Sequence, residues 1–311
     1  MDCGLRLVEC VPNFSEGRRP EVVGAIAEAM SSVAGAMVLD VSPDGDHNRA
    51  VITLVGRPES ALEAAYRGVA KAVELIDMEK HTGGHPRIGA ADVVPFVPVR
   101  GVTMEECVAL ARSLGERVAR ELGVPVYLYG EAASRPERRS LAHIRRGQYE
   151  GLKRSIAEPD RHPDFGPPQL HPTAGATIVG ARKPLLAYNV DLDTTDRALA
   201  DRIARAVRAS SGGLPHVMAA GIDMRARGRV QVSMNLTDTE VTPVQTAFEA
   251  VRREAEAAGV AVAGSEVVGL VTLEAVLDAV RHYLKAPDLR ADQVLEARLL
   301  GHLVERGGWS E

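Results

Sequence analysis

Short apolar runs alternate along the chain with longer segments in which apolar residues recur every three or four positions. The short runs predict strands, and the longer segments predict amphipathic helices. In the first part of the chain the expected strands cover residues 5–11, 37–41, 50–55, 91–99 and 126–129, and the expected helices cover 20–33, 59–76 and 104–122. Pro20 fits the first turn of its helix, because no backbone donor is needed there.

The same order of elements returns in the second half. Strands are expected at 185–190, 216–222, 230–236 and 260–270, with helices at 195–209 and 243–257. This repeated order predicts an α+β fold of two duplicated ferredoxin-like (βαββαβ) subdomains, each with an antiparallel-rich sheet and helices on one face. We place the N-terminal subdomain at residues 1–180 and the C-terminal subdomain at residues 181–311.

Three further segments complete the pattern. Residues 159–173 are dense in Pro, Asp, Gly and His and predict a long loop, which in a compact protein is usually functional. The helices expected at 273–283 and 291–303 would cap the sheet or mediate dimerisation. We expect a homodimer, in agreement with the second role.

The charge and composition narrow the classes of partner. The 311 residues are 45% hydrophobic and 25% charged, and the net charge of -5 argues against nucleic acid as a partner. No apolar run approaches the length of a membrane span and no signal peptide is recognised, so we expect no membrane partner and a cytoplasmic location. Cys3, Cys10 and Cys107 have neither disulfide nor zinc spacing and are expected to be reduced thiols.

The most informative segment is His81–Arg87, which places two imidazoles and a guanidinium on backbone that cannot be helical. The glycines allow a bend, and Pro86 disfavours helical dihedrals at His85. Without a helix, the four-residue spacing of the histidines is weak support for a metal site. A loop histidine more often only hydrogen-bonds backbone, but the neighbouring Arg87 favours proton transfer at His85.

A second polar loop, residues 44–49, precedes another expected strand. A hairpin turn with solvated charges explains Asp44 and Gly45, but it does not explain why a polar run from His47 to Arg49 enters an apolar strand. The glycines elsewhere match neither a phosphate loop nor a dinucleotide fingerprint, and no nucleophile motif is present. Direct transfer between two bound substrates therefore fits better than an acyl-enzyme mechanism.

Ordered blocks along nearly the whole chain carry a family resemblance. The blocks are residues Leu7–Gly17, His85–Arg87, Asp92–Phe96, Val126–Ala133, Asp164–Pro167, Gly180–Lys183 and Gly264–Leu270. Together they resemble the glutamate formiminotransferase (formimidoyltransferase) family. The two ferredoxin-like subdomains of that family agree with the duplication inferred from the hydrophobic pattern.

The resemblance implies transfer of the formimino group from N-formimino-L-glutamate to N5 of tetrahydrofolate in histidine degradation, giving 5-formiminotetrahydrofolate and L-glutamate. Tetrahydrofolate would be the co-substrate, and no metal would be needed. His85 matches the general base of the family. The folate-binding loop of the family matches Gly166, Pro167, Pro168, Gln169, Leu170, His171, Pro172, Thr173, Ala174 and Gly175.

Candidates for binding the substrates are Asp46, Asn48, Arg49, Arg87, Tyr129 and Arg182. Arginines suit the carboxylates of glutamate, and the rings of Tyr127, Tyr129 and Phe165 suit the pterin or aminobenzoyl group. Ser42 departs from the family, because the animal enzymes carry an acidic residue there. If a carboxylate orients His85, the role could fall to Asp40, Asp44 or Asp46.

The resemblance also implies a form without the helical cyclodeaminase domain that is fused downstream in the animal enzymes. Two alternatives to the formiminotransferase activity stay open. The chain could be a related one-carbon enzyme acting on 5-formyltetrahydrofolate, or a non-catalytic module that binds folate or an amino acid, because fold alone does not fix function.

Overall fold

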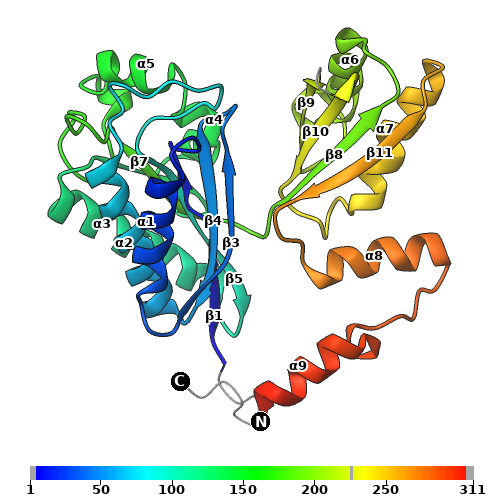
Figure 1. Ribbon diagram of the computed structural model, residues 1–311, viewed down its shortest axis with the longest axis horizontal. Helices are drawn as coiled ribbons and strands as arrows, with labels where there is room; N and C mark the ends of the chain where they lie inside the picture. The colour runs from blue at the N-terminus through cyan, green and yellow to red at the C-terminus, as the bar shows by residue number, and fades with distance from the viewer. Residues whose placement is uncertain (1–4, 225–226, 306–311) are drawn as a thin grey trace. The chain divides into compact units, whose positions relative to one another are not determined.

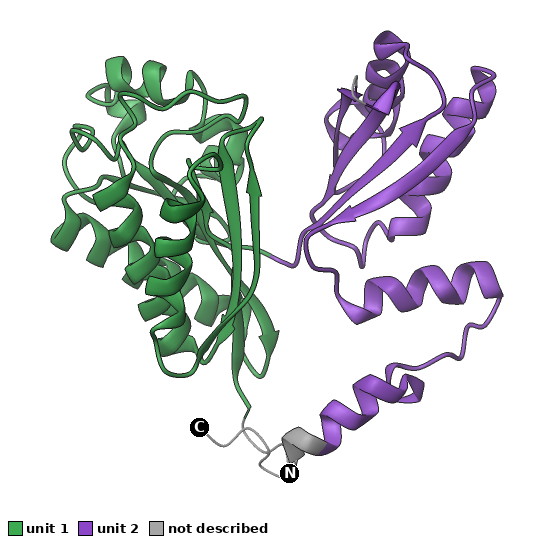
Figure 2. Cartoon of the chain, viewed as in Figure 1, with its two compact units in different colours: residues 1–182, 311 green, residues 183–310 purple. Residues whose placement is uncertain are grey.

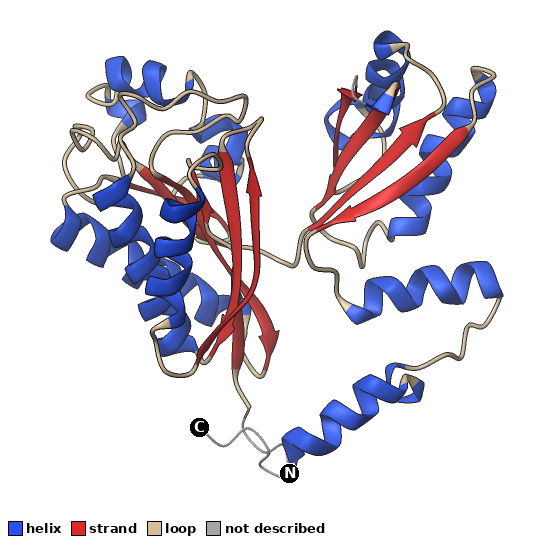
Figure 3. Ribbon diagram, in the orientation of Figure 1, coloured by secondary structure: helices blue, strands red, loops and turns tan. Residues whose placement is uncertain are grey.

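The computed structural model describes residues 5–224 and 227–305, and the chain divides into two compact units (Figures 1 and 2). Unit 1 ends at Arg182, and unit 2 begins at Lys183. Each unit combines a sheet with helices, so the α+β class is confirmed (Figure 3). No helix among the described residues is long and apolar enough to cross a membrane.

Unit 1 is built on a mixed sheet. Its strands are β1 (Leu7–Cys10), β2 (Asn13–Phe14), β3 (Ala36–Asp44), β4 (Arg49–Gly56), β5 (Ala91–Arg100), β6 (Val126–Gly130) and β7 (Thr177–Ala181). The sheet runs in the order β1-β4-β2-β5-β7-β6, with β3 paired to the free side of β4. Strand β7 lies parallel to both β5 and β6, whereas the other pairings are antiparallel.

Helices cover both faces of this sheet. The helices are α1 (Pro20–Ser31), α2 (Pro58–Leu75), α3 (Met104–Leu122), α4 (Leu141–Ile144) and α5 (Gln148–Ser155), with short 3-10 turns η1 (Pro136–Arg139) and η2 (Pro159–Arg161). On one face the first three helices pack around Phe14, Leu54 and Phe96 to form the main core. On the other face α4 and α5 pack over Tyr127 and Ile178 in a smaller cluster.

The hydrophobic pattern did not predict β7 or α5. The β7 segment is only five residues long and contains Gly180, so its apolar run is too brief to separate from a loop. Helix α5 is short and mostly polar, and it follows Gly147. Strand β7 nevertheless joins β5 to β6, and together with the short β2 it brings the sheet of unit 1 to seven strands, where five were expected.

Unit 2 follows the expected order of elements. It contains β8 (Leu186–Leu192), α6 (Arg197–Val207), η3 (Ala209–Ser211), β9 (Val217–Met224), β10 (Arg229–Leu236), α7 (Val244–Ala257), β11 (Val262–Val268), α8 (Leu273–Leu284), η5 (Ala291–Gln293) and α9 (Leu295–Glu305). The sheet is antiparallel in the order β11-β8-β10-β9. Helices α6 and α7 bury one face of it around Val190, Val232 and Leu236.

Candidate active site

The structure brings the two polar loops of unit 1 together. The backbone N–H of His85 donates to the carbonyl of His47 at 3.4 Å. A Cβ atom at Gly83 would lie 2.4 Å from the same carbonyl oxygen, so the loops can approach this closely only because residue 83 is a glycine. The segment of His85 is therefore held against the turn that leads into β4.

His85 faces a guanidinium. Its Nε2 lies 3.2 Å from Nη1 of Arg49, and since arginine can only donate, Nε2 accepts and the proton sits on Nδ1. Burial lowers the pKa of His85 to about 3, and the positive charges of Arg49 and Arg145 act in the same direction. At neutral pH the ring is therefore an uncharged base.

His81 has the opposite tautomer. Its Nε2 donates to the carbonyl of Asn48 at 3.0 Å, and its Nδ1 accepts from Nε of Arg87 at 3.2 Å. Burial lowers the pKa of His81 as well. Both ring nitrogens are engaged, so His81 is a structural group in this arrangement.

Arg87 is held by an acidic partner within unit 1. It is 6% exposed, and its two terminal nitrogens bind the carboxylate of Glu150 at 2.9 and 2.7 Å, while Nη1 also reaches Gln148. This bidentate pair fastens the segment after His85 to α5. Arg87, which the sequence suggested for substrate binding, is therefore already paired with Glu150.

Asn48 joins three segments through its side chain and backbone. Its Oδ1 accepts from the N–H of Gly17 at 3.0 Å, and its Nδ2 donates to the carbonyl of Thr82 at 2.8 Å. The residue is 8% exposed and has a φ of 50°, a conformation that asparagine tolerates better than most side chains. These contacts give Asn48 a role in shaping the site.

A buried ion pair lies next to His85. The carboxylate of Asp92, 1% exposed, accepts from the N–H of Ile88 at 2.8 Å and pairs with Nη2 of Arg145. Sequence reasoning did not select either residue, nor Asn13, whose Oδ1 accepts from Arg49 at 3.2 Å. A carboxylate that opens an apolar strand signals a buried cation partner, but the partner lies 53 positions away.

The proposed folate loop ends beside the His85 segment. Its last residue, Gly175, forms a bridge with Gly89, and the N–H of Ala90 donates to the carbonyl of Ala174 at 2.9 Å. Gly175 has a φ of 74°, and a Cβ there would lie 2.5 Å from the carbonyl oxygen of Ile88. Residues 166–169 are exposed.

Inside the loop, His171 and Gly175 exchange backbone hydrogen bonds in both directions, at 3.0 and 3.2 Å. Nδ1 of His171 accepts from the N–H groups of Thr173 and Ala174, and burial lowers the pKa of this ring. These contacts close residues 171–175 into a turn. These hydrogen bonds therefore fix the end of the loop close to His85.

The remaining candidates lie in several places. Tyr129 is 6% exposed on β6 and hydrogen-bonds Arg182, whose charge also acts on Glu9 of β1. Asp46 is exposed at the tip of the turn before β4. Arg182 and Tyr129 thus form one polar group on the ends of neighbouring strands, and Asp46 stands apart from it.

The carboxylates near the turn bond to residues other than His85. Oδ2 of Asp40 accepts from the Ser42 hydroxyl at 2.6 Å, and Oδ2 of Asp44 lies 2.6 Å from Nδ1 of His47. Among the residues that the structure describes, no carboxylate hydrogen-bonds the ring of His85. The orientation of His85 comes instead from Arg49 and the backbone contact with His47.

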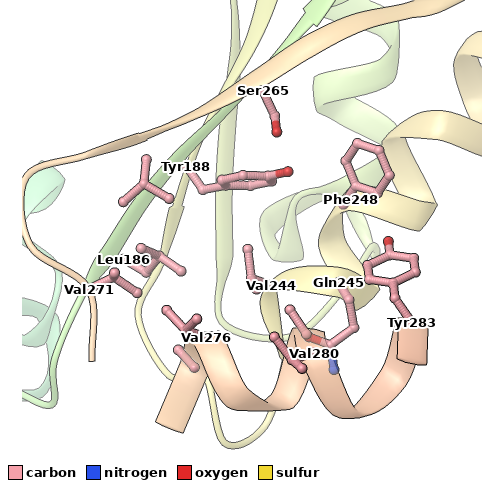
Figure 4. Close-up of a pocket in the computed structure, with 13 residues that line it drawn as sticks. Leu186, Tyr188, Val244, Gln245, Phe248, Ser265, Val271, Val276, Val280 and Tyr283 are labelled. Carbon is pink, nitrogen blue, oxygen red and sulfur yellow. The ribbon is translucent and has the colours of Figure 1, made fainter. Parts of the chain in front are cut away.

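Other features of the chain point away from chemistry. Figure 4 shows an apolar pocket of about 360 Å³ in unit 2, lined by β8, α7, β11 and α8 with side chains such as Leu186, Phe248 and Val276. Its lining includes no Asp, Glu, His, Lys or Arg side chain. Within residues 5–224 and 227–305 no cluster of His, Cys, Asp and Glu could hold a metal. Cys10 and Cys107 are free and buried, and Cys3 lies outside the described residues.

Comparison with known families gives matches over both units. The family described as formiminotransferase domain, N-terminal subdomain, matches residues 7–182, and the family described as formiminotransferase domain matches residues 187–310. Glutamate formimidoyltransferase of Streptococcus pyogenes serotype M1 is 46% identical over 297 residues, which cover 95% of this chain and 99% of that protein.

Two further relatives show similar identity. Glutamate formimidoyltransferase of Thermoplasma acidophilum is 48% identical over 297 residues, covering 95% of this chain and 98% of that protein. Formimidoyltransferase-cyclodeaminase of Mus musculus is 49% identical over 284 residues, covering 89% of this chain and 52% of that protein. The similarity therefore extends through both units and is comparable for all three relatives.

Proposed function

Because this chain belongs to the formiminotransferase family, we propose that it transfers the formimino group of N-formimino-L-glutamate to N5 of tetrahydrofolate. Tetrahydrofolate is the co-substrate, and the products are 5-formiminotetrahydrofolate and L-glutamate. The observation that carries the proposal is the neutral, half-buried His85 beside the end of a loop that matches the folate loop of the family.

His85 serves as the general base and acid of this reaction. N5 of tetrahydrofolate attacks the amidine carbon, and the ring of His85 takes the proton that N5 gives up. The bond between that carbon and the glutamate nitrogen then breaks, and His85 returns the proton to the departing nitrogen. One proton thus moves from N5 to the glutamate nitrogen through His85, and no other acid or base is needed. Holding the two substrates together at this base supplies much of the rate.

Folate binding is assigned to the loop Gly166–Gly175. Its end is fixed to Ile88–Ala90 by backbone hydrogen bonds, whereas its first four residues are exposed and free to meet a ligand. His85 precedes Ile88 by three residues. A folate bound to the loop therefore has its reactive N5 close to the base. Arg182 and Tyr129 lie on the ends of adjoining strands and supply a cation and a ring to the substrates.

The two units correspond in this proposal to an N-terminal and a C-terminal formiminotransferase subdomain, at residues 1–180 and 181–311. We also propose a homodimer. Helix α9 supports it, because Leu295, Leu299 and Leu300 are 75%, 55% and 54% exposed and form an apolar stripe that burial in a partner would satisfy. Sedimentation of the purified chain tests this, and a monomer at all concentrations would contradict it.

The decisive experiment incubates the purified chain with formiminoglutamate and tetrahydrofolate and measures glutamate and 5-formiminotetrahydrofolate. We expect both products in equal amounts, and a large loss of turnover in His85→Ala. A parallel reaction offers 5-formyltetrahydrofolate with glutamate. Turnover only in that reaction would favour the formyl donor, and folate binding with turnover in neither reaction would favour a binding module.

A further inference from the structure

The charges of two guanidinium groups act on His85. Nη1 of Arg49 contacts both Nε2 of His85 and Oδ1 of Asn13, each at 3.2 Å. Arg145 lies close enough that its charge acts on both Arg49 and His85. Each arginine also has a buried Nε–H that finds no hydrogen-bond partner within the described part of the chain.

The two carboxylates nearest to these arginines are bonded to groups other than Arg49. Asp92 pairs with Arg145, and Asp44 is engaged by His47, so no carboxylate of the described residues bonds the guanidinium of Arg49. Burial lowers the pKa of Arg49, which records how poorly its charge is solvated. Unpaired buried donors on like charges are costly unless a bound anion satisfies them.

We propose that Arg49 and Arg145 bind the α-carboxylate of formiminoglutamate, and that this contact draws Arg49 away from Nε2 of His85. The inference rests on the proposed function and names the group of the substrate that meets the site. A carboxylate supplies the acceptors that the two Nε–H groups lack. Once Arg49 turns toward it, the lone pair of His85 is free to take a proton.

The chemistry of the substrate selects this carboxylate. The α-carboxylate is attached to the carbon that bears the departing nitrogen, so it must lie near the base that protonates that nitrogen. The side-chain carboxylate of the same substrate is at the far end of the chain. The glutamate of tetrahydrofolate is separated from N5 by the aminobenzoyl group, so it is also too distant.

Binding of the carboxylate also changes the base. The groups that face His85 are Arg49, Arg145, His47 and Asp44, and the two arginines lower the pKa of the ring more than Asp44 raises it. A bound anion offsets them and raises the pKa of the imidazole in the complex. The substrate-free site thus keeps a weakly basic ring, and the substrate itself makes the ring a stronger base.

The test uses two unreactive ligands that differ in one group. N-acetyl-L-glutamate carries both carboxylates, and 4-acetamidobutyrate is the same molecule without the α-carboxylate. We expect calorimetry to show that the protein binds N-acetyl-L-glutamate roughly 10- to 100-fold more tightly, as for a charge-assisted contact. The double variant Asp92→Asn/Arg145→Met should lose most of this preference.

The double variant removes both members of the buried pair, because Arg145→Met alone would leave Asp92 uncompensated. Arg145→Lys is a second variant that keeps the charge and loses the planar fork, and it should lose part of the preference. Arg146→Met is the matched control, since Arg146 is the exposed neighbour in the sequence and should keep the full preference. If the double variant does not fold, Arg145→Lys decides.

A second measurement reads His85 directly. The NMR titration of its ring should move to higher pH when N-acetyl-L-glutamate saturates the protein, and 4-acetamidobutyrate should cause no such change. Equal binding of the two ligands, or unchanged preference in Arg145→Lys and the double variant, would overturn the inference. Neither measurement needs turnover, so an active enzyme without this preference refutes the inference alone, whereas an inactive chain refutes the proposed function.

Discussion

The low pKa of His85 makes the stability of the protein depend on pH in a direction that can be calculated. An unfolded histidine titrates near 6.5, and the folded ring near 3, because burial and the arginines disfavour its charge. Below pH 6.5 the unfolded chain therefore binds a proton that the folded protein does not bind. The sign follows: stability falls as the pH falls through 6.5, and the loss from this residue stops near the folded pKa.

The size of the effect comes from the same difference. Each pH unit below 6.5 costs about 1.4 kcal/mol, so the free energy of unfolding loses about 2 kcal/mol by pH 5 through His85 alone. His85→Gln removes this titration while keeping a polar side chain. We expect the parent to lose about 2 kcal/mol more than His85→Gln between pH 7 and pH 5.

Urea unfolding followed by circular dichroism measures this double difference. Other groups with lowered folded pKa values, such as Glu16 and Asp44, lose stability in the same direction, but they do so equally in parent and variant. His143→Gln, a half-exposed position of unit 1, is the matched control and should follow the parent. Parallel loss of stability in parent and His85→Gln, or an NMR midpoint of the ring near 6.5, would refute the reasoning.

Three further predictions address the site. His85→Ala should lower kcat by roughly two to four orders of magnitude with folate binding retained, and His81→Ala should lose less; equal losses would indicate a structural cluster. Asn48→Ala should destabilise the protein by about 2–3 kcal/mol, because two hydrogen bonds are lost and alanine disfavours the positive φ at this position. Asn48→Gly should cost about 1 kcal/mol less, because glycine accepts a positive φ. Equal free energies of unfolding in urea for the two variants would contradict the contribution of the positive φ. Hydrogen exchange in residues 166–175 should slow when a folate analogue binds, and unchanged exchange at saturation would argue against a folate loop.

The sequence predicts the elements in which buried and exposed positions alternate with a regular period. Helix α2 has an apolar face of alanines and Val69 against a polar face, and its periodic pattern is sufficient to locate it. Strand β7 is buried on both faces, and five small or branched residues carry no period. This strand forms because β5 and β6 offer free edges on both of its sides, and the residues of β7 itself do not show that.

The site divides in the same way. The sequence could select His85 because glycine and proline forbid a helix there, which is a local property. It could not select Arg145, since nothing near that residue shows that its guanidinium meets Asp92, and the region between β6 and β7 had no expected element. Arg87 shows the converse case. Its place next to His85 suggested a substrate contact, but the sequence near it does not show that its guanidinium pairs with Glu150.

The two histidines of the same segment differ in their hydrogen bonds, because different arginines face them. His81 and His85 are both half-buried, and burial lowers the pKa of both rings, so neither burial nor protonation separates them. His81 gives its proton to a backbone carbonyl and its lone pair to Arg87, and Arg87 is itself fixed by a bidentate carboxylate, so neither nitrogen can be released. Among the described residues, Arg49 alone contacts the lone pair of His85, and its side chain holds one further hydrogen bond there, to Asn13, so it can turn toward an anion. We therefore expect proton transfer at His85, the histidine whose guanidinium partner can turn away.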